Sequence, residues 1–107
     1  MSFFEQWCSD AFGADLTHDM LERAIEQSNI EYGGFKPSLS NVVFVHGNID
    51  PWHAMGVLED LHEEAPAIYI NGTSHCADMY PSAPGDPEGL DEAKIRIGEL
   101  VASWVGA

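Results

Sequence analysis

Two short apolar runs, each followed at once by polar turn residues, most constrain the fold of this chain. Val42–Val45 runs into the turn 46–48, and Ala67–Ile70 runs into the turn 71–74. Runs of this length that are apolar on both faces are typical of strands buried on both sides in a parallel sheet. We therefore predict an α/β fold built on two parallel strands with flanking helices.

Each predicted strand is followed by one candidate functional side chain. Asp50 follows the first strand and His75 follows the second. In open α/β sheets, binding and catalytic groups collect outside the carboxyl ends of the strands. The order strand, Asp, helix, strand, His, helix is that of the last part of a Ser, Asp, His hydrolase triad, in which a carboxylate orients an imidazole. The alternative is structural, because Asp before Pro is a common turn former and a lone loop His is usually a surface residue.

Four segments have apolar residues at helical spacing and predict helices. The third of them would join the two strands in a right-handed crossover. The four are the segment after the Ser2 and Glu5 capping box up to Gly13, the segment from Asp15 or Thr17 to the turn 32–34, Trp52–His62, and a last helix that begins between Glu88 and Asp91 and carries apolar residues to Trp104.

Composition fits one globular domain and excludes several classes of partner. The 107 residues are 45% hydrophobic, and we predict a single partial domain over 1–107. A net charge of −14 argues against nucleic acid, whose binding needs cations that neutralise phosphates, and against anionic membranes. No apolar run approaches the roughly 20 residues of a membrane helix. The first residues lack the basic start and apolar core of a signal peptide.

Five segments closely resemble one family of lysosomal and secreted serine peptidases. The family includes prolyl carboxypeptidase, dipeptidyl peptidase II and the thymus-specific serine protease, and the chain resembles the last most. The segments are NIDPWHA at 48–54, GVL at 56–58, GTSHCADMYP at 72–81, WCSDAFG at 7–13 and YGG at 32–34. The resemblance covers nearly the whole chain but only the C-terminal part of the family's length.

The resemblance implies the C-terminal part of an α/β-hydrolase fold and a role for several residues. Asp50 matches the triad acid and His75 the triad histidine. Trp52 matches the aromatic residue after the Asp-Pro pair, with a structural or substrate-binding role. His46 departs from the family pattern, and it is either a substrate contact or a solvent-facing turn residue.

The nucleophile of such a triad is missing from the sequence. None of the eight serines lies in a G-x-S-x-G elbow, so we expect the nucleophile and the oxyanion hole upstream of Met1 and no peptidase activity from this stretch alone. The resemblance implies a parent exopeptidase, lysosomal or secreted, that hydrolyses peptides near proline through an acyl-enzyme. Carboxypeptidase and dipeptidyl peptidase specificity both stay open.

Further candidate sites involve the cysteines, one asparagine and the histidines. Composition leaves a Cys8–Cys76 disulfide and two free thiols equally open, and the secretory family favours the disulfide. Asn71 begins an N-glycosylation sequon beside the His75 loop. No His or Cys pair has the spacing of a metal site, so we expect no metal and no cofactor.

The alternative function is non-catalytic: a truncated or diverged product that binds a partner or associates with itself. Two parallel strands alone leave sheet edges unpaired and apolar helix faces without neighbours. We therefore expect the isolated chain to be marginally stable or to self-associate.

Overall fold

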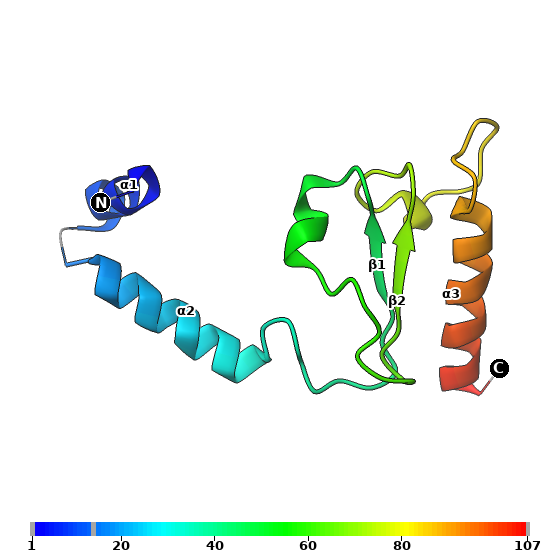
Figure 1. Cartoon of the computed structure of the whole chain (residues 1–107), viewed down its shortest axis with the longest axis horizontal. Helices are drawn as coiled ribbons and strands as arrows, with labels where there is room; N and C mark the ends of the chain where they lie inside the picture. The colour runs from blue at the N-terminus through cyan, green and yellow to red at the C-terminus, as the bar shows by residue number, and fades with distance from the viewer. Residues whose placement is uncertain (1, 14, 107) are drawn as a thin grey trace. The chain divides into compact units, whose positions relative to one another are not determined.

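The computed structural model describes residues 2–13 and 15–106, which form two compact units that meet between Pro37 and Ser38. The first unit holds two helices, and the second holds a two-stranded sheet and the last helix, as the colour progression in Figure 1 shows. The prediction of one partial domain over 1–107 stays a prediction.

Helix α1 spans Phe3–Phe12 and begins at the predicted capping box. The Ser2 hydroxyl accepts a hydrogen bond from the Glu5 backbone N–H at 3.3 Å, and the Glu5 carboxylate accepts one from the Ser2 N–H at 2.6 Å. These two bonds satisfy donors that the first helical turn leaves free. The helix ends at Gly13, which has a φ of 105°. The first predicted helix is therefore confirmed.

Helix α2 spans His18–Tyr32, in agreement with the second predicted helix. The Thr17 hydroxyl caps its start by accepting a hydrogen bond from the Met20 N–H at 3.3 Å. Gly33 ends the helix in a left-handed conformation that glycine adopts without steric cost, and its N–H donates to the Asn29 carbonyl.

A histidine ion pair joins α2 to α1. The Nδ1 of His18 lies 2.5 Å from Glu5 Oε1, and its Nε2 lies 3.2 Å from Glu22 Oε1. The hydrogen bond to Glu5 and the charge of Glu22 raise the pKa of His18 above its ordinary value.

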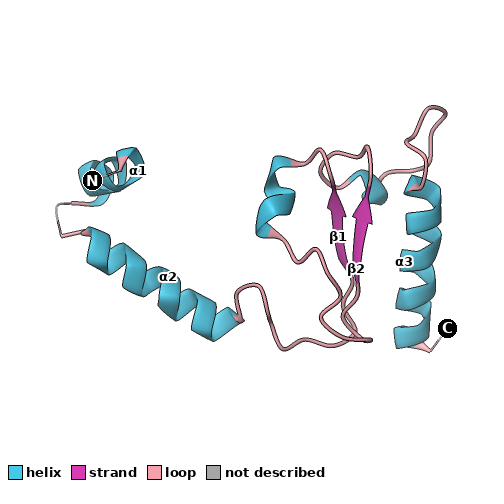
Figure 2. Ribbon diagram, viewed as in Figure 1, coloured by secondary structure: helices cyan, strands magenta, loops and turns pink. Residues whose placement is uncertain are grey.

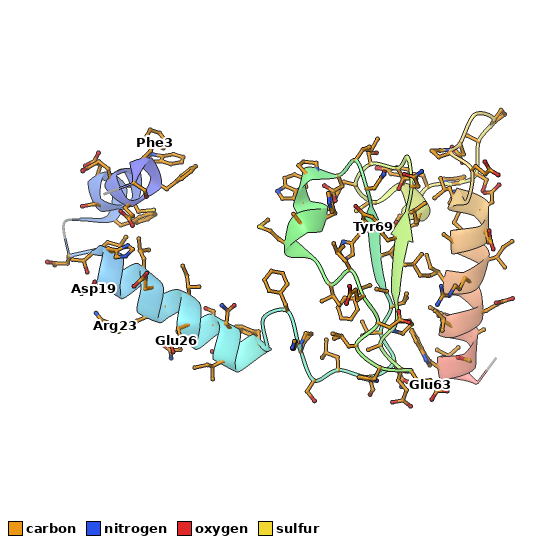
Figure 3. The ribbon with its side chains drawn as sticks, in the orientation of Figure 1. Phe3, Asp19, Arg23, Glu26, Glu63 and Tyr69 are labelled. Carbon is orange, nitrogen blue, oxygen red and sulfur yellow. The ribbon has the colours of Figure 1, made fainter. Side chains whose placement is uncertain are left out.

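No described residue of this first unit is fully buried. Most of its large apolar side chains are exposed. Figure 3 labels one of them, Phe3, on α1, and the others are Phe4, Trp7, Phe12, Met20, Ile25, Ile30, Tyr32 and Phe35. Most helical stability in proteins comes from packing an apolar face. The two helices therefore form no core of their own.

The second unit contains strands β1, Phe44–Gly47, and β2, Ala67–Ile70, paired in parallel with Phe44 opposite Ala67. The second predicted strand is confirmed. The first begins two residues later than predicted and continues into the expected turn, because the Asn48 N–H still donates to the Ile70 carbonyl at 3.0 Å.

Helix α3, Leu90–Val105, covers one face of this sheet and confirms the last predicted helix. Figure 2 shows it running beside the two arrows. The core consists of Ile68, Ile70, Leu90 and Ala93, with Val43, Val45, Ala77, Ile97 and Leu100 packed against it. On the other face, Tyr69 is 48% exposed. The prediction of a first strand buried on both faces is wrong, because Phe44, Val45 and His46 of β1 are each only partly buried.

The predicted crossover helix Trp52–His62 is also wrong. Its place is taken by a 3-10 helix, η1, over Pro51–Met55, and residues 56–66 form no helix. Gly56 leaves the helix in an extended conformation, with a ψ of 174°. Farther on, the Asp60 carboxylate accepts a hydrogen bond from the Ala67 N–H at 2.7 Å, which fixes the start of β2. This contact competes with a helix through Asp60, since side-chain to backbone bonds offer the chain an alternative.

We expect Leu90→Ala to destabilise the second unit far more than Ile95→Ala. Leu90 is 3% exposed within the core, whereas Ile95 lies on the same helix at 64% exposure. Truncating a buried leucine costs about 3 kcal/mol, through lost burial and a cavity, and an exposed site costs a small fraction of that. Thermal unfolding followed by circular dichroism measures the difference, and equal losses would contradict this core.

Candidate active site

The carboxyl ends of both strands lie at the same edge of the sheet, where the two arrows end in Figure 2. The loops that leave this edge are joined by hydrogen bonds. The Ile49 N–H donates to the Thr73 carbonyl at 3.1 Å. The Asn48 side chain accepts from the Gly72 N–H at 2.7 Å and donates to the Asn71 side chain. The loop after β1 is therefore fixed to the loop after β2.

Gly47 permits this close approach because it has no side chain. A Cβ at this position would lie 2.3 Å from the Thr73 carbonyl oxygen, 2.6 Å from Thr73 Oγ1 and 2.7 Å from the Ser74 carbonyl oxygen. These contacts are shorter than atoms tolerate, and all of them are made by the segment that leads into His75. Glycine at the end of β1 thus sets how near the two loops come.

The two loops bring Asp50 and His75 together. The Nδ1 of His75 lies 2.7 Å from Asp50 Oδ2. An ionised carboxylate can only accept hydrogen bonds, so Nδ1 carries the proton and, in the neutral ring, Nε2 has the free lone pair. The His75 side chain is 58% exposed, and no described residue hydrogen-bonds to Nε2. The imidazole is therefore oriented at one nitrogen and open at the other.

Asp50 is a nearly buried carboxylate, 4% exposed, with both oxygens engaged. Its Oδ1 accepts a hydrogen bond from the Trp52 backbone N–H at 3.0 Å. The hydrogen bond from His75 is the main cause that lowers the pKa of Asp50, and the Trp52 N–H lowers it further, against the opposing effect of burial. Asp50 is thus held ionised in a site where burial alone would favour the protonated acid.

Trp52 also contacts the imidazole through its side chain. The ring centroids of Trp52 and His75 lie 5.1 Å apart in an edge-to-face arrangement, with 70° between the planes. Edge-to-face pairs of this kind are favourable for aromatic rings. The indole is 59% exposed, so it borders the open side of the site. Its predicted roles, structural or substrate-binding, stay predictions.

His46 lies in β1 and not in a solvent-facing turn, so that alternative is wrong. Its ring packs so closely on Gly56 that a Cβ there would lie 2.1 Å from Cε1 and 2.5 Å from Nε2. Among the described residues, Nε2 of His46 is buried without a hydrogen-bond partner. The strand continues through His46 because the ladder persists to Gly47. A substrate contact by His46 stays a prediction.

The sequence reasoning gave no role at this site to His53, which lies three residues after Asp50. Its Nδ1 lies 2.5 Å from the Asp50 carbonyl oxygen. The available signal was the Asp-Pro start of a short turn, in which the fourth residue folds back on the first. The signal was overlooked because Trp52–His62 was expected to form a regular helix.

The other predicted sites are placed by the structure but not tested by it. Cys8 and Cys76 are free thiols here and belong to different units, so their disulfide stays a prediction. Asn71 is exposed and its side-chain oxygen is occupied by Asn48. Glycosylation at Asn71 stays a prediction as well.

Residues 2–13 and 15–106 contain no group of three or more His, Cys, Asp or Glu side chains that could hold a metal ion. Within the same ranges, no helix has the length and the apolar character needed to cross a membrane.

Comparison with known proteins decides the family. The profile of the family described as serine carboxypeptidase S28 matches residues 1–97. This chain belongs to that family. The mouse thymus-specific serine protease is 35% identical over 105 residues, which cover 98% of this chain, and the human thymus-specific serine protease is 34% identical over 98 residues, which cover 92%.

A mouse protein named lysosomal Pro-X carboxypeptidase is more distant, with 29% identity over 75 residues and 69% of this chain covered. The chain spans about a fifth of the length of the curated relatives it matches: 20%, 19% and 15% of these three. The S28 membership confirms the resemblance carried by the NIDPWHA and GTSHCADMYP segments.

We expect Gly47→Ala to separate Asp50 from His75. The new Cβ must displace the Thr73–Ser74 backbone, which leads directly into His75. The matched control is Gly98→Ala in α3, where nothing lies within 4 Å, and alanine in a helix interior is favoured by about 0.5–1 kcal/mol. Nitrogen-15 spectra of the histidine rings report the Nδ1–H form of His75. We expect it to be lost in the first variant and kept in the second.

We also expect the stabilisation by Asp50 to be lost in acid. A carboxyl whose pKa is lower in the folded chain stabilises it above the unfolded pKa, ordinarily 3.8, and this contribution disappears as the pH falls through the folded pKa. The difference in unfolding free energy between the natural chain and Asp50→Asn should therefore shrink below pH 3.8. Exposed Glu59→Gln controls for the change in net charge. A difference that persists far below that pH would contradict the ionised pair.

Proposed function

We propose that this chain supplies the acid and the histidine of a serine-peptidase triad, with Asp50 as orienter and His75 as general base. The observation that carries the proposal is the 2.7 Å hydrogen bond between His75 Nδ1 and buried Asp50 Oδ2, in a chain of the S28 family. A base oriented at Nδ1 and open at Nε2 is what the proton transfer requires.

The nucleophile in this proposal is a serine outside these 107 residues. Its hydroxyl donates its proton to His75 Nε2 as the oxygen attacks the substrate carbonyl, and Asp50 stabilises the imidazolium that forms. His75 then returns the proton to the leaving amine, which departs and leaves an acyl-enzyme. Water attacks the ester by the same route and restores the serine. On this proposal the chain alone is inactive, and the sheet belongs to an α/β-hydrolase fold.

For the substrate we propose peptides that are trimmed near proline. The support is the name of one relative, the lysosomal Pro-X carboxypeptidase. The same relative supports a lysosomal or secreted location. The reaction as written needs no metal and no cofactor, because the acid, the base and the nucleophile are all side chains.

A chimera tests the proposal without the remainder of the natural protein. The matching segment of the mouse thymus-specific serine protease, 105 residues, is replaced by this chain, and reaction with a fluorophosphonate serine probe is measured. We expect labelling of the chimera but not of the isolated chain. The substitution Asp50→Asn (D50N) or His75→Gln (H75Q) in the chimera should lower the labelling rate by about a thousandfold or more, since triad members act as a unit.

The exposed Glu59→Gln is the matched control, because it removes a carboxylate for which the described residues provide no hydrogen-bond partner. Its chimera should be labelled at the unaltered rate. Unchanged labelling in both the D50N and H75Q chimeras would refute the triad. That result would favour the alternative, a non-catalytic chain that binds a partner or associates with itself through its exposed apolar residues.

A further inference from the structure

His53 holds the main chain of the residue that orients His75. Within η1, the Asp50 carbonyl accepts two hydrogen bonds from His53: one from the backbone N–H at 3.1 Å and one from the ring Nδ1 at 2.5 Å. A carbonyl oxygen can only accept, so the ring must carry its proton on Nδ1. The ring bond is the shorter of the two. The turn itself needs only the backbone bond, so the ring bond depends on the histidine side chain.

The His53 ring also packs on the sheet. Its centroid lies 5.5 Å from that of Tyr69, with 49° between the planes. Tyr69 belongs to β2 and is labelled on that strand in Figure 3. The His53 side chain is half-buried between the turn and the strand. It therefore connects the acid-bearing turn to the strand that leads into the His75 loop.

The hydrogen bonds from His53 complete those made by the polar atoms of Asp50. Its N–H donates to the Gly47 carbonyl at 3.2 Å, its Oδ1 accepts from Trp52 and its Oδ2 accepts from His75. The carbonyl is left, and His53 supplies both of its donors. All four polar atoms of Asp50 are thus engaged, and the His53 side chain is what binds its carbonyl in addition to the backbone.

We propose that His53 is a positioning residue of this site, which holds the Asp50 main chain so that the carboxylate stays aligned with Nδ1 of His75. The inference deepens the triad proposal and rests on it. The contacts described for His53 are with the Asp50 carbonyl and the Tyr69 ring, so it acts through Asp50.

The main chain of Asp50 sets the position of its carboxylate because the aspartate side chain is short. The Asp50 carboxylate is two bonds from its Cα, so a rotation of the peptide group moves Oδ2 directly. Loss of the ring donor leaves the carbonyl with the longer backbone bond alone. Misplacement of a catalytic group by about 1 Å can cost a hundredfold in rate, so even a partial shift is measurable.

Two variants test the hydrogen-bond donor and the packed ring of His53 separately. His53→Phe keeps an aromatic ring against Tyr69 and removes the donor. His53→Asn removes the ring and keeps an amide N–H near the position of Nδ1. A purely structural role through ring packing predicts that the Asn variant is the more damaged, whereas the positioning role predicts the reverse.

The measurement is the protonated nitrogen of His75, read from nitrogen-15 ring spectra of the whole 107-residue chain at a pH where imidazoles are neutral. We expect the Nδ1–H form in the natural chain and in His53→Asn. In His53→Phe we expect it to give way to a form protonated mainly on Nε2. In the chimera described above, the Phe variant should lower fluorophosphonate labelling by about tenfold, and the Asn variant should recover most of that loss.

The outcomes distinguish this inference from the proposal on which it rests. If the natural chain shows His75 protonated on Nε2, both fail. If the natural chain shows Nδ1–H and His53→Phe retains it, only the role of His53 fails. If His53→Phe unfolds, His53→Asn decides: retention of Nδ1–H supports the positioning role, and its loss overturns it.

Discussion

The parallel pairing of β1 with β2 is the constraint on which the site depends. Parallel strands end at the same edge of the sheet, so an acid after one strand and a histidine after the next lie close together there. The register of the two strands is enough to bring them to this edge. The register places Gly47 opposite Ile70, and the absence of a side chain at Gly47 lets the Thr73–Ser74 backbone lie against β1. A one-residue slip would move both loops, because side chains alternate between faces.

Burial of the Asp50 carboxylate illustrates how this edge is stabilised. A buried charge is costly unless hydrogen bonds satisfy it, and here the two oxygens accept from Trp52 and His75. The same bonds keep the acid ionised and orient the imidazole. Stability and chemistry therefore depend on one arrangement, and Trp52 contributes to both through its backbone N–H and its indole.

Local signals predicted much of the fold, and non-local contacts account for what they missed. The Ser2 and Glu5 capping box, the Gly33 stop and the apolar stripe of α3 each act within a few residues, and all three helices were predicted. The helix expected over Trp52–His62 failed because distant groups compete for its residues: the His46 ring packs on Gly56, and Asp60 binds the start of β2. Periodicity of apolar residues carries no information about such contacts.

The sequence by itself determined the family, the two strands and the order in which Asp50 and His75 follow them, since motifs and apolar runs are local properties of the chain. Only the tertiary structure decided that His75 Nδ1 hydrogen-bonds to Asp50 Oδ2 and that His53 hydrogen-bonds to the Asp50 carbonyl. It also decided that His46 packs on Gly56. These are distances between groups on different elements or on a folded-back turn. The folded backbone sets such distances, and residue spacing along the chain does not.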